Sequence, residues 1–379
     1  MRVLALVHGL YDTSPGQRYR IEQWEPLLRE RGVEITYEPF ECEELNALLY
    51  QPGFLGRKMR LVASGLRRRL TAVRNARNFD LVYVFREAAL LGPPLFERLV
   101  YQSGVPMVFD FDDAIFVSYR SPSNGYLSYL KFAGKTKTIC RMASHVMVGN
   151  PYLADYARRY NDHVTVVPTT IDTDHYQRAP RPEPNVPVIG WTGSYSTLQH
   201  LDTLRTVFQR LAQRHVFQLK VIGSTSDYKI EGVQVESIKW RSKTEVEDLS
   251  NIDIGVMPLP DDPWSRGKCG LKALQFMALG IPTICSPVGV NSEIIQDNQN
   301  GLLADSEDDW VEKLSGLLQS RKLRERLGQA GRATVNEKYS AKTQAPRVYE
   351  VFKSVVRNAD VKVDALRHSA SASQKSSVT

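Results

Sequence analysis

The chain lacks any long apolar run. No stretch approaches the roughly 20 consecutive apolar residues that a membrane-spanning helix needs, although 42% of its 379 residues are hydrophobic. The opening residues MRVLALVHG contain too short an apolar segment for a signal peptide and are better interpreted as a first buried strand. These observations argue against a membrane-spanning protein and predict a soluble, cytoplasmic chain.

Cysteine is scarce and unclustered. Cys42, Cys140, Cys269 and Cys285 lie far apart without the spacing of metal ligands, so we expect reduced thiols and no metal site. The G-x-G-x-x-G turn that binds dinucleotides is also missing after the first predicted strand, where the sequence is HGLYDTSPGQRYR. A nicotinamide or flavin enzyme is therefore disfavoured, and we expect no cofactor.

Acidic residues are absent between Arg57 and Arg77, a segment that holds eight Lys or Arg. Apolar residues recur there at helical spacing, which predicts a basic amphipathic helix or helix pair at 57–77. Such a helix suits an anionic membrane surface, and it suits equally a solvated helix that packs through its apolar stripe. Nucleic acid is a weaker third interpretation because no recognisable nucleic-acid-binding motif accompanies the patch, so we expect no such partner.

Short apolar runs alternate with amphipathic stretches along the chain. This rhythm predicts parallel sheets with helices on both faces. It pauses at RAPRPEPNVP (178–187), a proline-rich segment that is typical of a stiff linker. We therefore predict two doubly wound α/β domains, at 1–177 and 188–340. A helix at 341–358 and a Ser-rich, disordered tail at 359–379 would follow.

The turns that follow the strands carry the chemical information, because ligands bind beyond the carboxyl ends of such sheets. The turn after the first strand holds Gly16 and Arg18, which suit a phosphate or a polyhydroxylated substrate. Asp110 and Asp112 end a later strand. Carboxylates at that place point to a metal, to sugar hydroxyls or to a general base. Helix capping is the simpler alternative for one of them.

The segment SRGKCGLKALQFMALGIPT (265–283) surrounds a helix start with three cations, Arg266, Lys268 and Lys272. A helix N-terminus has unpaired N–H groups and a partial positive charge, so added cations there favour a phosphate. A solvated helix end is the simpler alternative. Gln275 lies three residues after Lys272 and shares its helix face. In the same domain, Gly193 and Ser194 begin another turn of backbone donors.

These features together resemble the GT-B glycosyltransferases of family 4, which are retaining enzymes that use nucleotide-sugar donors. The similarity covers roughly residues 1–350. It is carried by SPGQRYRIEQWEPLLRERGVEITYEPF (14–40), VTVVPTTIDTDHY (164–176) and LQFMALGIPTICSPVGVNSEIIQDNQNGLLA (274–304). The resemblance implies two Rossmann-like domains that face a central cleft, with the acceptor on the first and the nucleotide sugar on the second.

The sequence departs from this family pattern at several charged positions. The family usually has two glutamates, of which the first touches the donor sugar and the second the ribose. Gly267 and Gln275 stand in their places. The family's Arg and Lys clamp on the donor diphosphate is also missing, and Trp191 stands in one of those places. The group of Asp110 and Asp112 replaces the usual histidine beside the scissile bond.

Chemistry and resemblance together sort the candidate site residues into three groups. Asp110, Asp112 and Lys268 are the candidate catalytic residues. The candidate donor-binding residues are Gly16, Arg18, Gly193, Ser194, Trp240, Arg266, Lys268, Gly270, Leu271, Lys272 and Gln275, with Trp240 near the nucleobase by resemblance. Arg20, Tyr119 and Asn124 are assigned to the acceptor side.

The sequence therefore predicts transfer of a sugar from a nucleoside diphosphate sugar to a hydroxyl of a glycan or lipid-linked acceptor, as in the synthesis of a cell-surface polysaccharide or glycolipid. The resemblance implies retention of anomeric configuration, and the cations would neutralise the leaving diphosphate without a metal. Two alternatives stay open, because fold does not fix function. One is an epimerase or hydrolase of nucleotide sugars. The other is a non-catalytic protein that binds a nucleotide or glycan.

Overall fold

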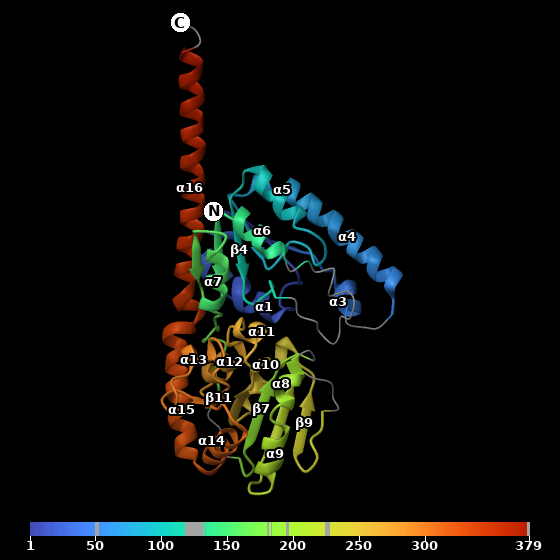
Figure 1. Ribbon diagram of the computed structural model, residues 1–379, viewed down its shortest axis with the longest axis vertical. Helices are drawn as coiled ribbons and strands as arrows, with labels where there is room; N and C mark the ends of the chain where they lie inside the picture. The colour runs from blue at the N-terminus through green and yellow to red at the C-terminus, as the bar shows by residue number, and fades with distance from the viewer. Residues whose placement is uncertain are drawn as a thin grey trace.

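The computed structural model describes residues 1–49, 53–117, 132, 134–179, 182, 184–194, 197–223 and 228–376. They form two parallel six-stranded sheets with helices around each, and one sheet lies above the other in Figure 1. The predicted class, α/β with two doubly wound domains, is confirmed.

The first sheet has the order β2-β1-β3-β4-β5-β6. Its strands are β1 (Arg2–Val7), β2 (Glu34–Pro39), β3 (Leu81–Phe85), β4 (Met107–Phe111), β5 (His145–Val148) and β6 (Val164–Val166). Every residue of β3 and β4 is buried, as expected for parallel strands that are covered on both faces. The covering helices are α1 (Pro15–Gln17), η1 (Arg18–Glu22), α2 (Gln23–Arg29), α3 (Glu43–Leu49), α4 (Leu55–Arg74), η2 (Ala76–Asn78), α5 (Leu95–Ser103), α6 (Lys135–Met142) and α7 (Pro151–Arg158).

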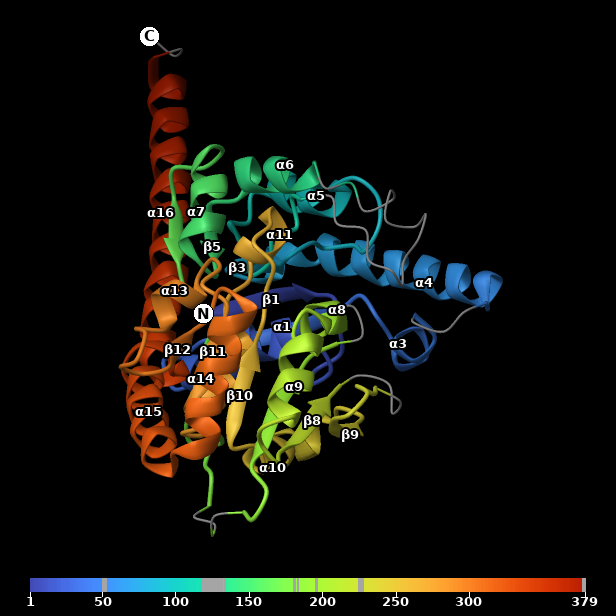
Figure 2. The same ribbon diagram turned by 60° about the horizontal axis from the view of Figure 1, so that its bottom comes forward.

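The second sheet has the order β12-β11-β10-β7-β8-β9. Its strands are β7 (Val188–Thr192), β8 (Gln218–Ile222), β9 (Gln234–Ile238), β10 (Ile254–Met257), β11 (Thr283–Cys285) and β12 (Leu302–Leu303). The helices are α8 (Leu198–Asp202), α9 (Arg205–Ala212), η5 (Ser242–Thr244), α10 (Glu245–Ser250), α11 (Pro263–Arg266), α12 (Leu271–Ala278), α13 (Asn291–Ile294), α14 (Glu307–Gln319), α15 (Arg321–Thr334) and η6 (Val335–Tyr339). Helices α9 and α14 lie side by side against this sheet (Figure 2).

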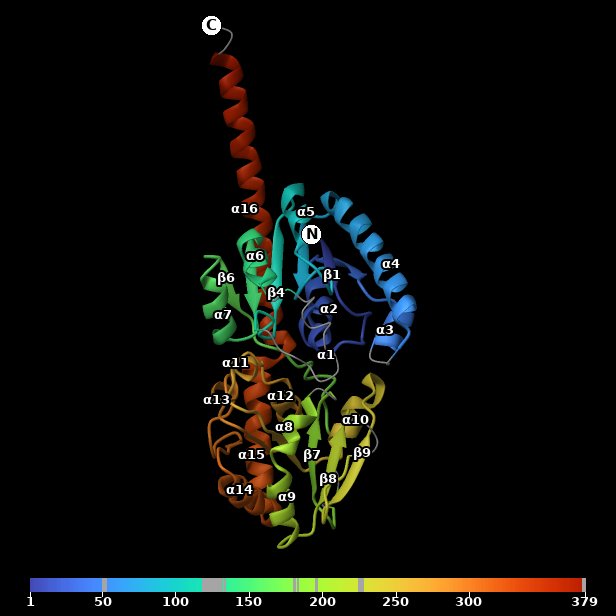
Figure 3. The same ribbon diagram turned by 45° about the vertical axis from the view of Figure 1, so that its right-hand side comes forward.

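The carboxyl ends of the two sheets face one another, with α1 and α11 between them (Figure 3). In each sheet the chain leaves its first strand toward one side and later returns to the other side. The switch points are therefore β1/β3 in the first domain and β7/β10 in the second. These are the positions where ligands bind in such sheets.

The last helix, α16 (Ala341–Ser376), returns from the second domain to the first, where it packs on α2 and β3. Its apolar face includes Val348, Phe352 and Val355, which are all buried. Helical backbone continues through most of the segment 359–379, where the sequence predicts disorder. That segment contains no Gly or Pro to end a helix. Figure 1 shows this part of α16 projecting beyond the first domain.

Replacement of Phe352 by Ala tests the attachment of α16. The ring is fully buried, and its centroid lies 6.0 Å from that of Tyr83 in an edge-on contact. We expect Phe352→Ala to lower the free energy of unfolding by about 3–5 kcal/mol. In urea unfolding this appears as a lower midpoint concentration. The exposed Val361→Ala in the same helix is the matched control. Equal midpoints for the two variants would contradict this packing.

Candidate functional site

The turn after β7 begins the candidate donor site. Gly193 is required there, because a Cβ atom at this position would lie 2.5 Å from the ring of Trp191 and 2.7 Å from Thr197 Oγ1. The Ser194 backbone N–H donates to Thr197 Oγ1 over 3.1 Å, which closes the turn. Gly193 and Ser194 therefore lie at the β7/β10 switch point, as the sequence suggests.

Helix α12 begins at the same switch point. Its N-cap residue Gly270 has a left-handed φ of 70°, which favours glycine. A Cβ atom there would also lie 2.3 Å from Ile294 Cδ1, so no larger residue fits. No side chain among the described residues caps the helix start, so the first backbone N–H groups after Gly270, beginning at Leu271, can bind an anion.

Lys272 is the cation that lies at this helix start. Its ammonium group is 4.5 Å from the centre of the Trp191 ring and 3.4 Å from Thr197 Oγ1. Among the residues that the structure describes, no carboxylate pairs with it. Burial, with the nearby charge of Lys268, lowers the pKa of Lys272 to about 7. An anion that binds beside Lys272 favours the protonated ammonium form and raises this pKa again.

The other two predicted phosphate ligands already have carboxylate partners in this structure, so their contact with a donor stays a prediction. Lys268 Nζ lies 2.8 Å from Asp113 Oδ1 of the first domain and 4.9 Å from the Trp264 ring. Arg266 is half exposed and pairs with Asp261 at 2.6 Å. Sequence shows the number of cations in a segment but not which of them already have counter-charges.

Gly267 occupies the place of the family's first glutamate and lies in a tight contact between domains. A Cβ atom at Gly267 would come within 2.5 Å of Ala114 Cβ and 2.8 Å of Ala114 N. Next to it, Asn150 Nδ2 donates to the Lys268 carbonyl over 2.9 Å. A glutamate cannot fit at position 267 while the domains are in this arrangement.

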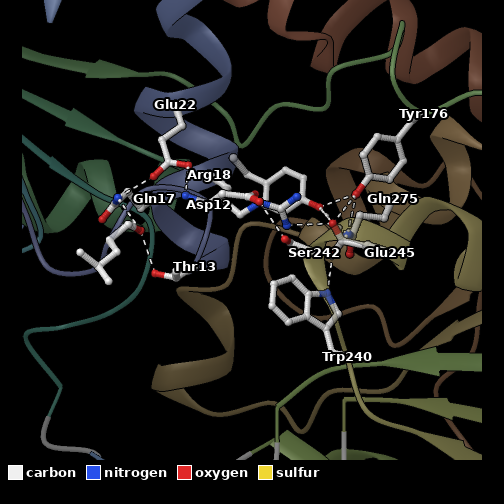
Figure 4. A network of polar contacts seen from close by, with 12 residues as sticks. Asp12, Thr13, Gln17, Arg18, Glu22, Tyr176, Trp240, Ser242, Glu245 and Gln275 are labelled. Atoms are coloured by element: carbon white, nitrogen blue, oxygen red, sulfur yellow. Dashed lines mark hydrogen bonds and ion pairs between the residues drawn. The ribbon is translucent and has the colours of Figure 1, made fainter. Parts of the chain in front are cut away.

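Gln275 belongs to a buried polar network that joins the two domains (Figure 4). Its amide Nε2 donates to Tyr19 Oη at 2.7 Å, to Glu245 Oε1 at 3.0 Å and to Tyr176 Oη at 3.1 Å. Trp240 Nε1 donates to the same Glu245 oxygen over 2.8 Å. The Nε2 group of Gln275 is therefore already hydrogen-bonded in this arrangement, and its ribose contact stays a prediction.

Arg18 enters the same network from the first domain. It forms ion pairs with Glu245 at 2.8 Å and with Asp12 at 2.6 Å, and its guanidinium group lies 5.6 Å from the centre of the Trp240 ring. Arg18 and Trp240 thus contact one another across the domain boundary, as residues of one site would. Sequence reasoning missed Glu245, whose position at a helix start looks like ordinary favourable placement of an acid.

Asp110 and Arg20 form a structural ion pair, which corrects their assignments as a catalytic and an acceptor-side residue. Both side chains are fully buried, and Arg20 Nε donates to Asp110 Oδ2 over 3.0 Å. Arg20 also donates to the Val167 carbonyl, and Tyr83 Oη donates to Asp110. Burial raises the pKa of Asp110 despite this arginine. Neither group can touch a substrate here.

Asp112 lies nearer the domain boundary but is also paired. Arg86 Nε is 2.7 Å from Asp112 Oδ1, and Arg86 Nη2 is 2.7 Å from Asp113 Oδ2. Burial alone would raise the pKa of Asp112, but the arginine outweighs it and holds the pKa below its usual range. Gly16 packs against this pair, since a Cβ there would lie 2.7 Å from Arg86 Nη2. Asp112 is therefore part of an ion pair with Arg86, and Gly16 of α1 packs over this pair.

Two predicted acceptor residues, Tyr119 and Asn124, lie outside the described residues. Within the part of the chain that is described, no group of three or more His, Cys, Asp or Glu side chains is placed to hold a metal ion. The expectation that the reaction needs no metal or cofactor stays a prediction.

Comparison with known proteins identifies the second domain. Residues 186–320 match the family described as "Glycosyl transferases group 1". The second domain is similar to that family over these residues. The predicted enzyme class, a glycosyltransferase, is confirmed at this level. A search of the curated proteins found no match.

Solved glycosyltransferase structures share the fold over nearly the whole chain. Sucrose-phosphate synthase from Thermosynechococcus elongatus is 16% identical with a TM-score of 0.68, covering 94% of this chain and 99% of that one. A glycosyltransferase from Rickettsia africae is 14% identical with a TM-score of 0.67, covering 94% and 99%. Anabaena HepE in complex with UDP-glucose is 14% identical with a TM-score of 0.65, covering 93% and 100%. These matches confirm the GT-B fold.

Gly267→Ala tests the contact that replaces the family's first glutamate. The residue has a φ of −78°, which Ala tolerates, so a loss of stability relative to a control Gly→Ala change measures the collision with Ala114. We expect a loss of about 1–3 kcal/mol, read from thermal unfolding. Gly316→Ala, in a helix with open space around it, is the matched control and should be neutral or stabilising. Parallel behaviour of the two variants would show that the domains do not meet at Gly267.

Proposed function

We propose that this protein transfers a sugar from a nucleoside diphosphate sugar to a hydroxyl of a glycan or lipid-linked acceptor. The observation that carries the proposal is the position of Lys272. Its ammonium group is half-buried without a carboxylate partner among the described residues, at the start of α12 and at the β7/β10 switch point. The diphosphate of a donor supplies the missing counter-charge.

The leaving group explains why a cation and a helix start occur together. When the bond between the anomeric carbon and the β-phosphate oxygen breaks, negative charge develops on the diphosphate. The first N–H groups of α12 and the ammonium group of Lys272 stabilise that charge. Uridine nucleotides are the donor class that we propose, because the Anabaena neighbour was solved with UDP and with UDP-glucose.

We propose further that the anomeric configuration is retained. A double displacement needs a carboxylate nucleophile, and both Asp110 and Asp112 are engaged with arginines. Front-face attack fits this arrangement. The acceptor oxygen bonds to the anomeric carbon on the side that the diphosphate leaves, and the hydroxyl proton passes to the leaving phosphate oxygen.

Binding of UDP to a Lys272→Met variant tests the donor site. We expect UDP affinity to fall by about tenfold to a hundredfold, since a charge-assisted hydrogen bond is lost. Because the pKa of Lys272 is about 7 in the free protein and an anion raises it, binding to the unmodified protein at pH 8 should take up a proton. Calorimetry in buffers of different ionisation enthalpy measures both effects. Lys322→Met, an exposed lysine of α15, is the control, and equal UDP affinity of the two variants would refute the assignment.

We also propose that α4 and α5 dock the enzyme on the anionic inner face of a membrane, where lipid-linked acceptors lie. Helix α4 packs inward through Gly65, Ala72 and Val73, while its first turns expose apolar side chains. The exposed apolar residues of this surface are Phe54, Leu55, Met59 and Leu66 on α4 and its cap, and Leu95, Leu99 and Tyr101 on α5. None of the described helices is long and apolar enough to cross a bilayer.

Sedimentation with vesicles tests this surface. We expect the protein to bind vesicles that contain phosphatidylglycerol at low salt and to bind less at high salt, because exposed cations supply part of the attraction. A Leu55→Glu, Met59→Glu variant should lose binding. Val216→Glu changes an exposed residue of the second domain and is the control. Vesicle binding that is unaffected by the double change would remove the membrane proposal.

A further inference from the structure

A buried histidine lies beside the cation of the proposed donor site. His200 belongs to α8, the helix that follows the turn of Gly193 and Ser194, and it is 4% exposed. The N-cap residue of this helix, Thr197, lies three positions earlier, and its Oγ1 atom is 3.4 Å from Lys272 Nζ. His200 is therefore one helical turn along α8 from the contact that joins this helix to Lys272.

The charges that act on His200 come from three neighbouring elements. The pKa of His200 is lowered to about 4, first by burial and then by the positive charges of Lys272 on α12 and of Lys268 just before that helix. The carboxylate of Asp262, the N-cap residue of α11, acts in the opposite direction but does not outweigh them. The imidazole is therefore neutral near pH 7 as long as no anion is bound.

The imidazole of His200 has no hydrogen-bond partner among the residues that the structure describes. Its backbone carbonyl accepts from Thr203 Oγ1 over 2.7 Å. The half-buried His145, by contrast, lies 2.9 Å through its Nε2 atom from Thr165 Oγ1. A buried polar group without a partner costs free energy, so packing alone would favour an apolar side chain at position 200. A ligand that hydrogen-bonds to the ring explains why a histidine stands there.

We propose that His200 binds the diphosphate of the donor as an imidazolium, together with Lys272. This rests on the proposed function. A diphosphate beside Lys272 brings negative charge to two groups whose protonation burial opposes, so both take up protons from solvent as the complex forms. The full positive charge of the site then appears only with its counter-charge, which avoids burying unpaired cations side by side in the free protein.

The pH dependence of UDP affinity tests this proposal. UDP is titrated by calorimetry at pH 6 and at pH 8 into the unchanged protein, His200→Gln and the control His215→Gln. His215 is a half-buried histidine of the same domain, placed just before β8 at the amino end of the sheet, where its Nε2 atom is 2.9 Å from Ser315 Oγ. Affinities are compared as ratios at the same pH, which cancels the titration of UDP itself. His200→Leu carries the same test if His200→Gln does not fold.

We expect His200→Gln to bind UDP about tenfold or more weakly than the unchanged protein at pH 6, but only about twofold to threefold more weakly at pH 8. The direction follows from the pKa of His200, which is about 4 in the free protein and is raised by the bound anion. The complex therefore holds an imidazolium at pH 6 and loses it as the pH rises. His215→Gln should match the unchanged protein at both pH values.

Equal UDP affinity of His200→Gln and the unchanged protein at both pH values would overturn the proposal. A loss of the same size at both would also overturn it, because a neutral or purely structural residue gives no pH dependence. Binding that is weakened in Lys272→Met but unaltered in His200→Gln would keep the donor site and refute only the role of His200. Failure of the unchanged protein to bind UDP would refute the donor site itself, and this proposal with it.

Discussion

The carboxylate of Glu245 is the contact on which the arrangement of the two domains depends. It is buried, and burial of a negative charge is costly unless the charge is paired and hydrogen-bonded. Five side chains donate to it, namely Arg18, Tyr19, Tyr176, Trp240 and Gln275. The cation among them comes from the first domain, so contact between the domains balances the charge of a residue in the second.

The two glutamates that the family pattern has and this chain lacks are explained by the same contact between domains. At position 267 a side chain would collide with the backbone of Ala114. At position 275 a second carboxylate would stand 3.0 Å from Glu245, where the amide of Gln275 now donates a hydrogen bond. Two like charges at that distance would repel one another in a buried setting. The substitutions therefore follow from how closely the domains pack and need not signal an abandoned site.

The fold was predictable from sequence because it depends on periodicity. Buried strands such as β3 and β4 and the helices between them give a repeating pattern, and that pattern fixes two doubly wound sheets. The need for glycine at 193 and 270 agrees with the turns expected from the sequence, because a Cβ atom there would collide with Trp191 or with Ile294. Pairings between residues far apart in the chain were not predictable. Arg20 pairs with Asp110, 90 residues away, and Arg18 pairs with Glu245, 227 residues away. No local sequence pattern indicates either pair.

The three cations of the 265–283 segment show why this limit matters for function. They are alike in sequence, but Arg266 has Asp261 as its partner and Lys268 has Asp113. Lys272 instead lies on the ring of Trp191, a contact that orients an ammonium group without neutralising it. Trp191 stands where the family that the sequence resembles has part of its diphosphate clamp. Its ring orients Lys272, the cation that we propose serves in place of the missing one. In the proposed donor site, an anion gives Lys272 the counter-charge that Arg266 and Lys268 already have in Asp261 and Asp113.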